Sequence, residues 1–300
     1  MSVPYRHIRH QGAVLAALGR VAVAAVTQKI GDAESPVTEF PGPSITAVVP
    51  ARSNELIDDF IRWSGGQVSA WKTAVPPTMF PQWGFPLLGD ALQGVDYPLA
   101  KVLNGGCRIE NYAPIPRDTP LHLSGCIENI DDDGRRAILN QKLTTHAPNG
   151  DLLQIARVYG VVPLGGPRPD GGKKKKAPVV VPVGARPVAD WNIAGDSGLS
   201  FACLTGDFNP IHWLAPYAKV AGFGRRILHG FGTLAGSLER IRRAAWAGDT
   251  SLPPVVDVRF TRPLKLPARV RIYLHNDEFY VGEAPGGRAY LQGSFGPLGG

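Results

Sequence analysis

The sequence predicts an α+β fold in which one unit, a helix followed by an antiparallel sheet, occurs twice. The chain has 36 glycines and 28 prolines among 300 residues, which suits a sheet with many short connections better than a helical bundle. Apolar residues at helical spacing precede strand-like runs in both halves. A segment rich in glycine, proline and lysine separates the two halves.

The first half begins with a helical pattern in which Leu56, Phe60, Ile61 and Trp63 are the apolar positions. A proline-rich crossing at Pro76 and Pro77 leads to a second helical stretch at residues 85–92. Alternating residues then predict four strands, at residues 106–111, 121–130, 135–145 and 152–162.

The second half repeats this order. A short helix is expected at residues 197–204, and a longer one at 230–246 has a continuous apolar face. Four strand-like runs follow, at residues 255–260, 269–274, 279–282 and 288–293. The predicted organisation is an N-terminal helical extension, a first repeat, an exposed linker containing Lys173–Lys176, and a second repeat, at residues 1–36, 37–163, 164–188 and 189–300.

The extension has an apolar stretch at residues 13–26, interrupted by Gly19 and Arg20. A signal peptide is partly similar, but Arg20 splits the apolar core and no small-residue cleavage site ends it. The stretch is also too short to span a bilayer, so we expect no integral membrane segment. An amphipathic helix packed on the protein body is the favoured interpretation, with contact to a membrane surface as the alternative.

The charges and cysteines narrow the class of partner. The net charge is +7, and four of the positive charges lie in Lys173–Lys176. A mildly basic body suits an anionic small molecule, and the absence of a basic stripe interleaved with aromatic residues argues against nucleic acid. The three cysteines have no metal-ligand or redox-motif spacing, which favours a reducing compartment, and we expect the cytoplasm.

Chemistry is concentrated in one segment of the second half, where Asp207, Asn209 and His212 lie between Gly206 and a helix start. Gly206 and Pro210 bracket an irregular turn. Asp207 could therefore be a helix cap, Asn209 a turn residue and His212 a packed side chain. Alternatively, the carboxylate and the imidazole form an acid–base pair.

Gly230 supports the acid–base interpretation. It opens the longest predicted helix, where its backbone N–H would be unpaired at the positive end of the helix dipole. Such an amide can stabilise a developing oxyanion, and a glycine lets a thioester carbonyl approach closely. The preceding residue, His229, is expected to be structural and to cap the helix start.

At these residues the chain resembles the MaoC-like dehydratases, which include the (R)-specific enoyl-CoA hydratases. The resemblance rests on residues 201–212, on Ala218-Lys219 and Gly222-Phe223, and on residues 227–230. A fainter similarity in the first half involves Tyr97-Pro98-Leu99 and the residues around 104–106. Taken together, the resemblance extends over roughly residues 40–295. It implies a double hotdog, in which each repeat is a long helix wrapped by an antiparallel sheet. The first repeat lacks the Asp/His segment and is expected to be non-catalytic.

The resemblance also implies an activity: a hydro-lyase that reversibly hydrates trans-2-enoyl-CoA, or the carrier-protein thioester, to the (R)-3-hydroxyacyl product. Asp207 and His212 would activate water and exchange the proton, Asn209 would hold the water or the carboxylate, and the Gly230 N–H would polarise the thioester carbonyl. No metal or other cofactor is expected. Candidates for substrate binding are Arg225, Lys219 and Phe231, and the protein is expected to be a monomer or a homodimer.

Two other functions remain open. A hotdog acyl-thioesterase would place a carboxylate on the long helix, and here the candidate is Glu239, about two turns into that helix. A non-catalytic acyl-thioester-binding protein would keep the fold without turnover. The presence of Asp207, His212 and Gly230 together argues against the second alternative.

Overall fold

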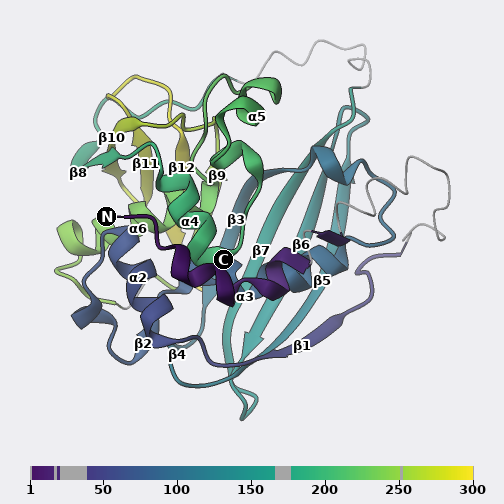
Figure 1. The fold of residues 1–300 in the computed structure, drawn as a ribbon. Coiled ribbons are helices and arrows are strands. Elements are labelled where there is room, and N and C mark those ends of the chain that lie inside the picture. The colour runs from purple at the N-terminus through teal and green to yellow at the C-terminus, as the bar shows by residue number, and fades with distance from the viewer. Residues whose placement is uncertain (1, 17–18, 21–38, 166–176, 251–252, 300) are drawn as a thin grey trace.

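The computed structural model describes residues 2–16, 19–20, 39–165, 177–250 and 253–299 (Figure 1). Expectations for residues 21–36 and for the lysine run 173–176 lie outside the described residues. Among the described residues, no helix has both the length and the apolar character needed to cross a bilayer.

A ten-stranded antiparallel sheet forms the framework, in the order β1-β5-β6-β7-β3-β9-β12-β11-β10-β8. The first five strands in that order come from the first half of the chain and the last five from the second. The bounds are β1 Ile45–Val49, β3 Leu103–Asn111, β5 Leu121–Asp132, β6 Arg136–His146, β7 Leu152–Pro163, β8 Arg186–Ile193, β9 Val255–Phe260, β10 Ala268–His275, β11 Glu278–Gly282 and β12 Leu291–Gly296. The halves join where β3 pairs with β9, with Ile109 opposite Val256. A separate pair of short strands, β2 (Ala74–Val75) and β4 (Ile115–Pro116), lies in the first half.

Each half of the sheet curves around its own helix (Figure 1). The helix α3 (Pro81–Ala91) contacts β1, β5 and β6, and the longer α6 (Gly230–Ala245) contacts β8, β10 and β12. This arrangement confirms the predicted α+β double hotdog. Other helices are α2 Asn54–Ser64, α4 Ser197–Thr205 and α5 Ala215–Val220, and residues 12–16 are also helical. The 3-10 turns include η1 Tyr5–His10, η2 Val68–Trp71, η3 Pro77–Met79, η4 Leu99–Lys101 and η5 Pro210–His212.

One hydrophobic core runs through both repeats. The Phe80 ring of the first repeat meets Phe231 of α6 edge-on, with ring centroids 5.2 Å apart. The Trp63 ring of α2 packs on Phe201 of α4 at 4.9 Å. Aromatic pairs of this kind add to the free energy of burial, so side chains of the first repeat help to hold α4 and α6 in place.

The sheet departs from the sequence prediction mainly at its two edges. The sequence prediction contains neither of the outer strands, β1 and β8, because no residue of β1 is buried and only Trp191 and Ile193 of β8 are. The expected linker also ends earlier than residue 188. Val181 is fully buried, the neighbouring Val180 forms a bridge with Arg288, and β8 begins at Arg186. The apolar valines that follow the lysine run therefore already belong to the second repeat.

Candidate active site

The segment after α4 folds back along that helix. Gly206 caps the end of α4: its N–H donates to the Ala202 carbonyl at 2.7 Å, and its left-handed φ of 85° turns the chain out of the helix. At the other end of α4, a Cβ on Gly198 would lie 2.1 Å from the carbonyl oxygen of His212, so only glycine allows this approach. Asp207 thus leaves the last turn of α4, and His212 returns beside its first turn.

His212 is buried, and its tautomer follows from one contact. Its Nδ1 lies 2.9 Å from the carbonyl oxygen of Ile227, which can only accept a hydrogen bond. Nδ1 therefore carries the proton and Nε2 has a free lone pair. Burial lowers the pKa of His212 below its usual 6.5, and the nearby Asp207 charge only partly opposes this effect. At neutral pH the imidazole is uncharged and can accept a proton.

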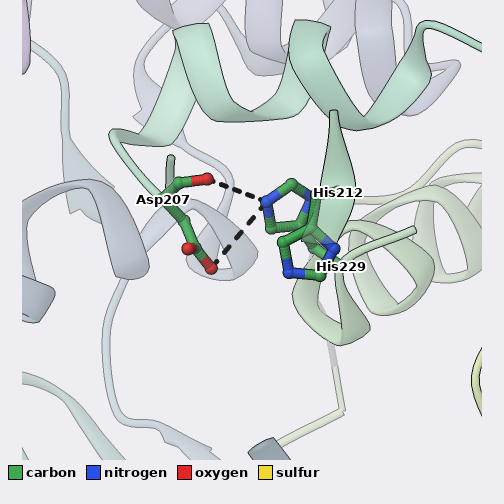
Figure 2. A group of neighbouring side chains, drawn as sticks. All are labelled: Asp207, His212 and His229. Carbon is green, nitrogen blue, oxygen red and sulfur yellow. Dashed lines mark hydrogen bonds and ion pairs between the residues drawn. The ribbon is translucent and has the colours of Figure 1, made fainter. Parts of the chain in front are cut away.

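The Asp207 carboxylate lies near both His212 and His229. Its Oδ2 is 3.8 Å from the His229 Nε2, a contact drawn as a dashed line in Figure 2, and its charge also acts on the His212 imidazole. Each of the three side chains offers one ligand-type atom within 4.8 Å of the others. The Asp207 side chain is 21% exposed, so the carboxylate keeps access to solvent or substrate. The structure thus brings together the predicted acid–base pair.

His229 occupies the N-cap position of α6, as predicted, but its side chain makes no capping hydrogen bond. Instead its Nε2 donates to the backbone carbonyl of Asp207 at 2.9 Å, and its ring stacks on that of His212 with centroids 3.5 Å apart. Complete burial, aided by the neighbouring His212, holds the pKa of His229 well below its usual value. A neutral His229 thus contacts both predicted catalytic residues: it bonds the backbone of Asp207 and stacks on the ring of His212.

The stacked rings also bear on metal binding. Two imidazoles and a carboxylate are ligands that Zn²⁺ accepts, at about 2.0–2.2 Å. The rings are inclined by only 25°, so their in-plane lone pairs run nearly side by side instead of meeting at one point. The His229 Nε2 is moreover committed to the Asp207 carbonyl. The arrangement suits proton transfer better than coordination of an ion.

Gly230 opens α6 as predicted. Its N–H lies in the first turn of the helix, where no preceding helical turn supplies an acceptor carbonyl. Among the described residues, this N–H has no hydrogen-bond acceptor. The Phe260 ring covers the helix start, and a Cβ on Gly230 would lie 2.4 Å from that ring. The fold therefore requires glycine here and leaves an amide N–H available.

The other predicted site residues are placed less centrally. Asn209 is exposed, and its side-chain oxygen accepts from the Ile211 N–H at 3.3 Å, which makes it the cap of η5. Lys219 is exposed on α5. Phe231 is buried among Phe80, Phe85 and Phe260, so in this structure it supports the helix start instead of facing a ligand.

Arg225 lines a cavity of about 330 Å³ that the sequence did not predict. The cavity is strongly basic, with a single carboxylate, and its polar lining residues are Arg225, Arg262, Lys265, Arg269, Glu283 and Tyr290. It adjoins the site because Lys265 bridges to Ile227, the residue whose carbonyl holds His212. In the sequence, the cavity is indicated only by the high density of basic residues between 259 and 271. No sequence pattern shows that these residues lie near Arg225 in the fold.

Glu239, the carboxylate on which a thioesterase would depend, is buried and fully engaged. Its two oxygens accept from the Trp71 indole at 2.8 Å and from Arg242 at 3.0 Å. Burial raises the pKa of Glu239, against the opposing effect of Arg242. This carboxylate joins α6 to the first repeat and has no free oxygen with which to activate water.

The family model for the MaoC-like domain matches residues 182–283, which include the whole Asp207–Gly230 site. Residues 182–283 belong to the MaoC-like family. This match covers the second repeat from before β8 to the end of β11, and the likeness to solved structures extends the fold to both repeats. The chain superposes on HtdX of Mycobacterium tuberculosis with a TM-score of 0.68 and 20% identity, covering 84% of this chain and 98% of that one.

Curated relatives are similar over a shorter range. The mouse peroxisomal multifunctional enzyme type 2 is 32% identical over 57% of this chain and 23% of its own length. The peroxisomal enoyl-CoA hydratase 2 of Arabidopsis thaliana is 28% identical over 58% of this chain and 61% of its own. The matched part thus spans less than two thirds of either relative.

The two neutral, buried histidines predict a pH-dependent stability. Their pKa values are lowered in the folded state, so below about pH 6.5 the unfolded chain binds protons that the folded chain does not. The free energy of unfolding should therefore fall as the pH drops from 6.5 to 5, by up to about 1.4 kcal/mol per pH unit for each histidine.

Urea titrations of wild type and His229→Gln across this range would measure the effect. In the variant, the dependence of the free energy of unfolding on pH should lose the contribution of one histidine. Parallel slopes for wild type and His229→Gln would contradict the assignment of a neutral His229.

Proposed function

We propose that this protein adds water reversibly to 2-enoyl thioesters, giving 3-hydroxyacyl thioesters. The observation that supports this most directly is the convergence of a carboxylate, a neutral imidazole with a free Nε2, and an unpaired amide at a helix N-terminus. Such a set supplies general acid–base catalysis and oxyanion stabilisation together. The names of the relatives, enoyl-CoA hydratase 2 among them, point in the same direction.

In the proposed reaction, the thioester carbonyl accepts the Gly230 N–H, which draws electron density from the conjugated double bond. Asp207 and the His212 Nε2 orient a water molecule and take one of its protons as its oxygen bonds to C3. The π-electron pair moves to C2, giving an enolate that the Gly230 amide stabilises. The Asp207/His212 pair then delivers a proton to C2. Delivery from the same face as the water makes the addition syn, and the face of C3 that the water attacks decides whether the product is (R).

The basic cavity supports a phosphate-bearing carrier for the thioester. Arg225, Arg262, Lys265 and Arg269 outnumber Glu283 there, and guanidinium groups bind phosphate through paired hydrogen bonds. We assign the cavity to the phosphates of CoA, or to the phosphopantetheine of a carrier protein. The three free cysteines suit a reducing compartment such as the cytoplasm.

The test is a spectrophotometric assay with crotonyl-CoA and longer trans-2-enoyl-CoA substrates. Hydration removes the conjugated thioester absorbance, and chiral analysis of the product would show whether it is (R). A thiol-trapping reagent added with saturated acyl-CoA would detect hydrolysis instead. Free thiol without bleaching would favour a thioesterase, and tight binding with neither signal would favour a binding protein.

Glu239→Gln separates the first two functions within one variant. Since Glu239 holds Arg242 and Trp71 and touches no site residue, we expect hydration to stay within about threefold of wild type. The free energy of unfolding should fall by about 1–3 kcal/mol, because a buried charged hydrogen bond is weakened. Loss of turnover at unchanged stability would instead assign Glu239 a direct part in the chemistry.

A further inference from the structure

An N-terminal segment packs against the helix that carries Asp207. We call residues 5–16 the N-terminal strap; it comprises η1, Gln11 and the helical residues 12–16. In Figure 1 this purple segment runs alongside α4, which it contacts through η1. The strap lies far from the second repeat in sequence, so its contacts there are purely tertiary.

The first part of the strap is anchored on the first repeat. His7 is completely buried, and its Nε2 lies 2.8 Å from a carboxylate oxygen of Asp59 on α2. Arg6 from the strap and Arg62 from α2 also bind Asp59, at 2.5 and 2.9 Å. Breaking these contacts would leave the largely buried Asp59 carboxylate without its partners, which is costly. The Asp59 contacts therefore hold the strap in one place.

Gln11 then bonds the last turn of α4 from outside the helix. Its side-chain amide donates to the Cys203 carbonyl at 3.0 Å, and its oxygen accepts from Gln82 of α3 at 3.3 Å. The carbonyls in the last turn of a helix have no partner within the helix. Gln11 therefore satisfies one of them and links α3 of the first repeat to α4 of the second.

Val14 covers the residue that precedes Asp207. Its side chain is 2% exposed and lies against Gly206, where a Cβ would come within 2.6 Å of it. Gly206 is the left-handed residue at which the chain turns out of α4. Gln11 and Val14 thus clamp both the carbonyl and the turn that determine where the Asp207 side chain emerges.

We propose that the N-terminal strap positions Asp207 and that Gln11 and Val14 are its positioning residues. This inference rests on the proposed function, since Asp207 is the acid–base residue of that reaction. Without the Gln11 hydrogen bond and the Val14 contact, the last turn of α4 can fray and the carboxylate can move away from His212. A displacement of about 1 Å at reacting groups can cost up to about 10² in rate.

The experiment compares Gln11→Met and Val14→Ala with wild type in the enoyl-CoA assay, using the full chain. Met keeps the length of Gln but cannot donate, so only the hydrogen bond is removed. We expect kcat to fall roughly tenfold in each variant, with KM within about threefold, because the cavity and Gly230 are untouched. Val14→Ile, which keeps the contact, should restore activity. Leu15→Ala, at a half-exposed neighbour in the same strap, is the matched control.

A second measurement does not depend on turnover. Amide hydrogen exchange of peptides covering residues 203–212 should accelerate in Gln11→Met and Val14→Ala, while peptides from β9–β12 stay protected as in wild type. If wild type is inactive but exchange accelerates as described, the proposed function fails and the strap's positioning role stands. Unchanged exchange in residues 203–212, or unchanged kcat in an active enzyme, would overturn the inference.

Discussion

Replacing Asp207 with Asn, or His212 with Ala, should lower kcat for enoyl-CoA hydration by about 10²–10⁴ each, the scale of a lost general acid–base group. Asn keeps the shape of Asp but cannot take a proton, and Ala removes the free Nε2. Because the two groups would act on one water molecule, the double variant should be little slower than either single variant. Steady-state rates from the bleaching assay would measure all three.

Matched controls make this result specific. Asp190→Asn makes the same change at a largely exposed carboxylate paired with Arg271, and should leave kcat unaltered. Asn209→Ala should cost less than about tenfold, because the Asn209 side chain caps η5 and lies at the surface. Full turnover in folded Asp207→Asn and His212→Ala would exclude the proposed chemistry.

The second large effect is expected at Gly230. Alanine there would place a Cβ 2.4 Å from the Phe260 ring, well inside contact distance, so the start of α6 or the ring must shift. We expect kcat to fall by about 10²–10³, the scale of a lost oxyanion donor, because the Gly230 N–H is displaced. Overpacking of this kind should also cost about 1–3 kcal/mol of stability.

A compensating variant separates the amide's position from a general loss of structure. Phe260→Ala removes the Cγ, Cδ2 and Cε2 atoms that the new Cβ would meet, so Gly230→Ala/Phe260→Ala should recover much of the lost activity. Gly296→Ala, at a β12 glycine with open space around it, is the control for the substitution itself and should be neutral. If Gly230→Ala alone keeps full activity, the amide at this helix start is not the oxyanion donor.

Local patterns of apolar residues in the sequence were sufficient to predict most of the helices and strands. Apolar periodicity located α2 and α6, and alternation located most of the inner strands within a few residues. These elements are each determined by their own residues, because burial of one face imposes a period of 3.6 or 2 on the sequence. In the edge strands β1 and β8 that signature is weak, since few of their residues are buried.

The sequence by itself determined the chemical groups of the site: Asp207, His212 and Gly230 lie within one stretch whose turns and helix start can be recognised locally. Only the tertiary structure decided how they are held. The stacking of His229 on His212, the basic cavity around Arg225 and the packing of Val14 on Gly206 all join residues from separate elements. Such contacts leave no periodic trace in the chain, because they depend on how the elements pack and not on the conformation of any one of them.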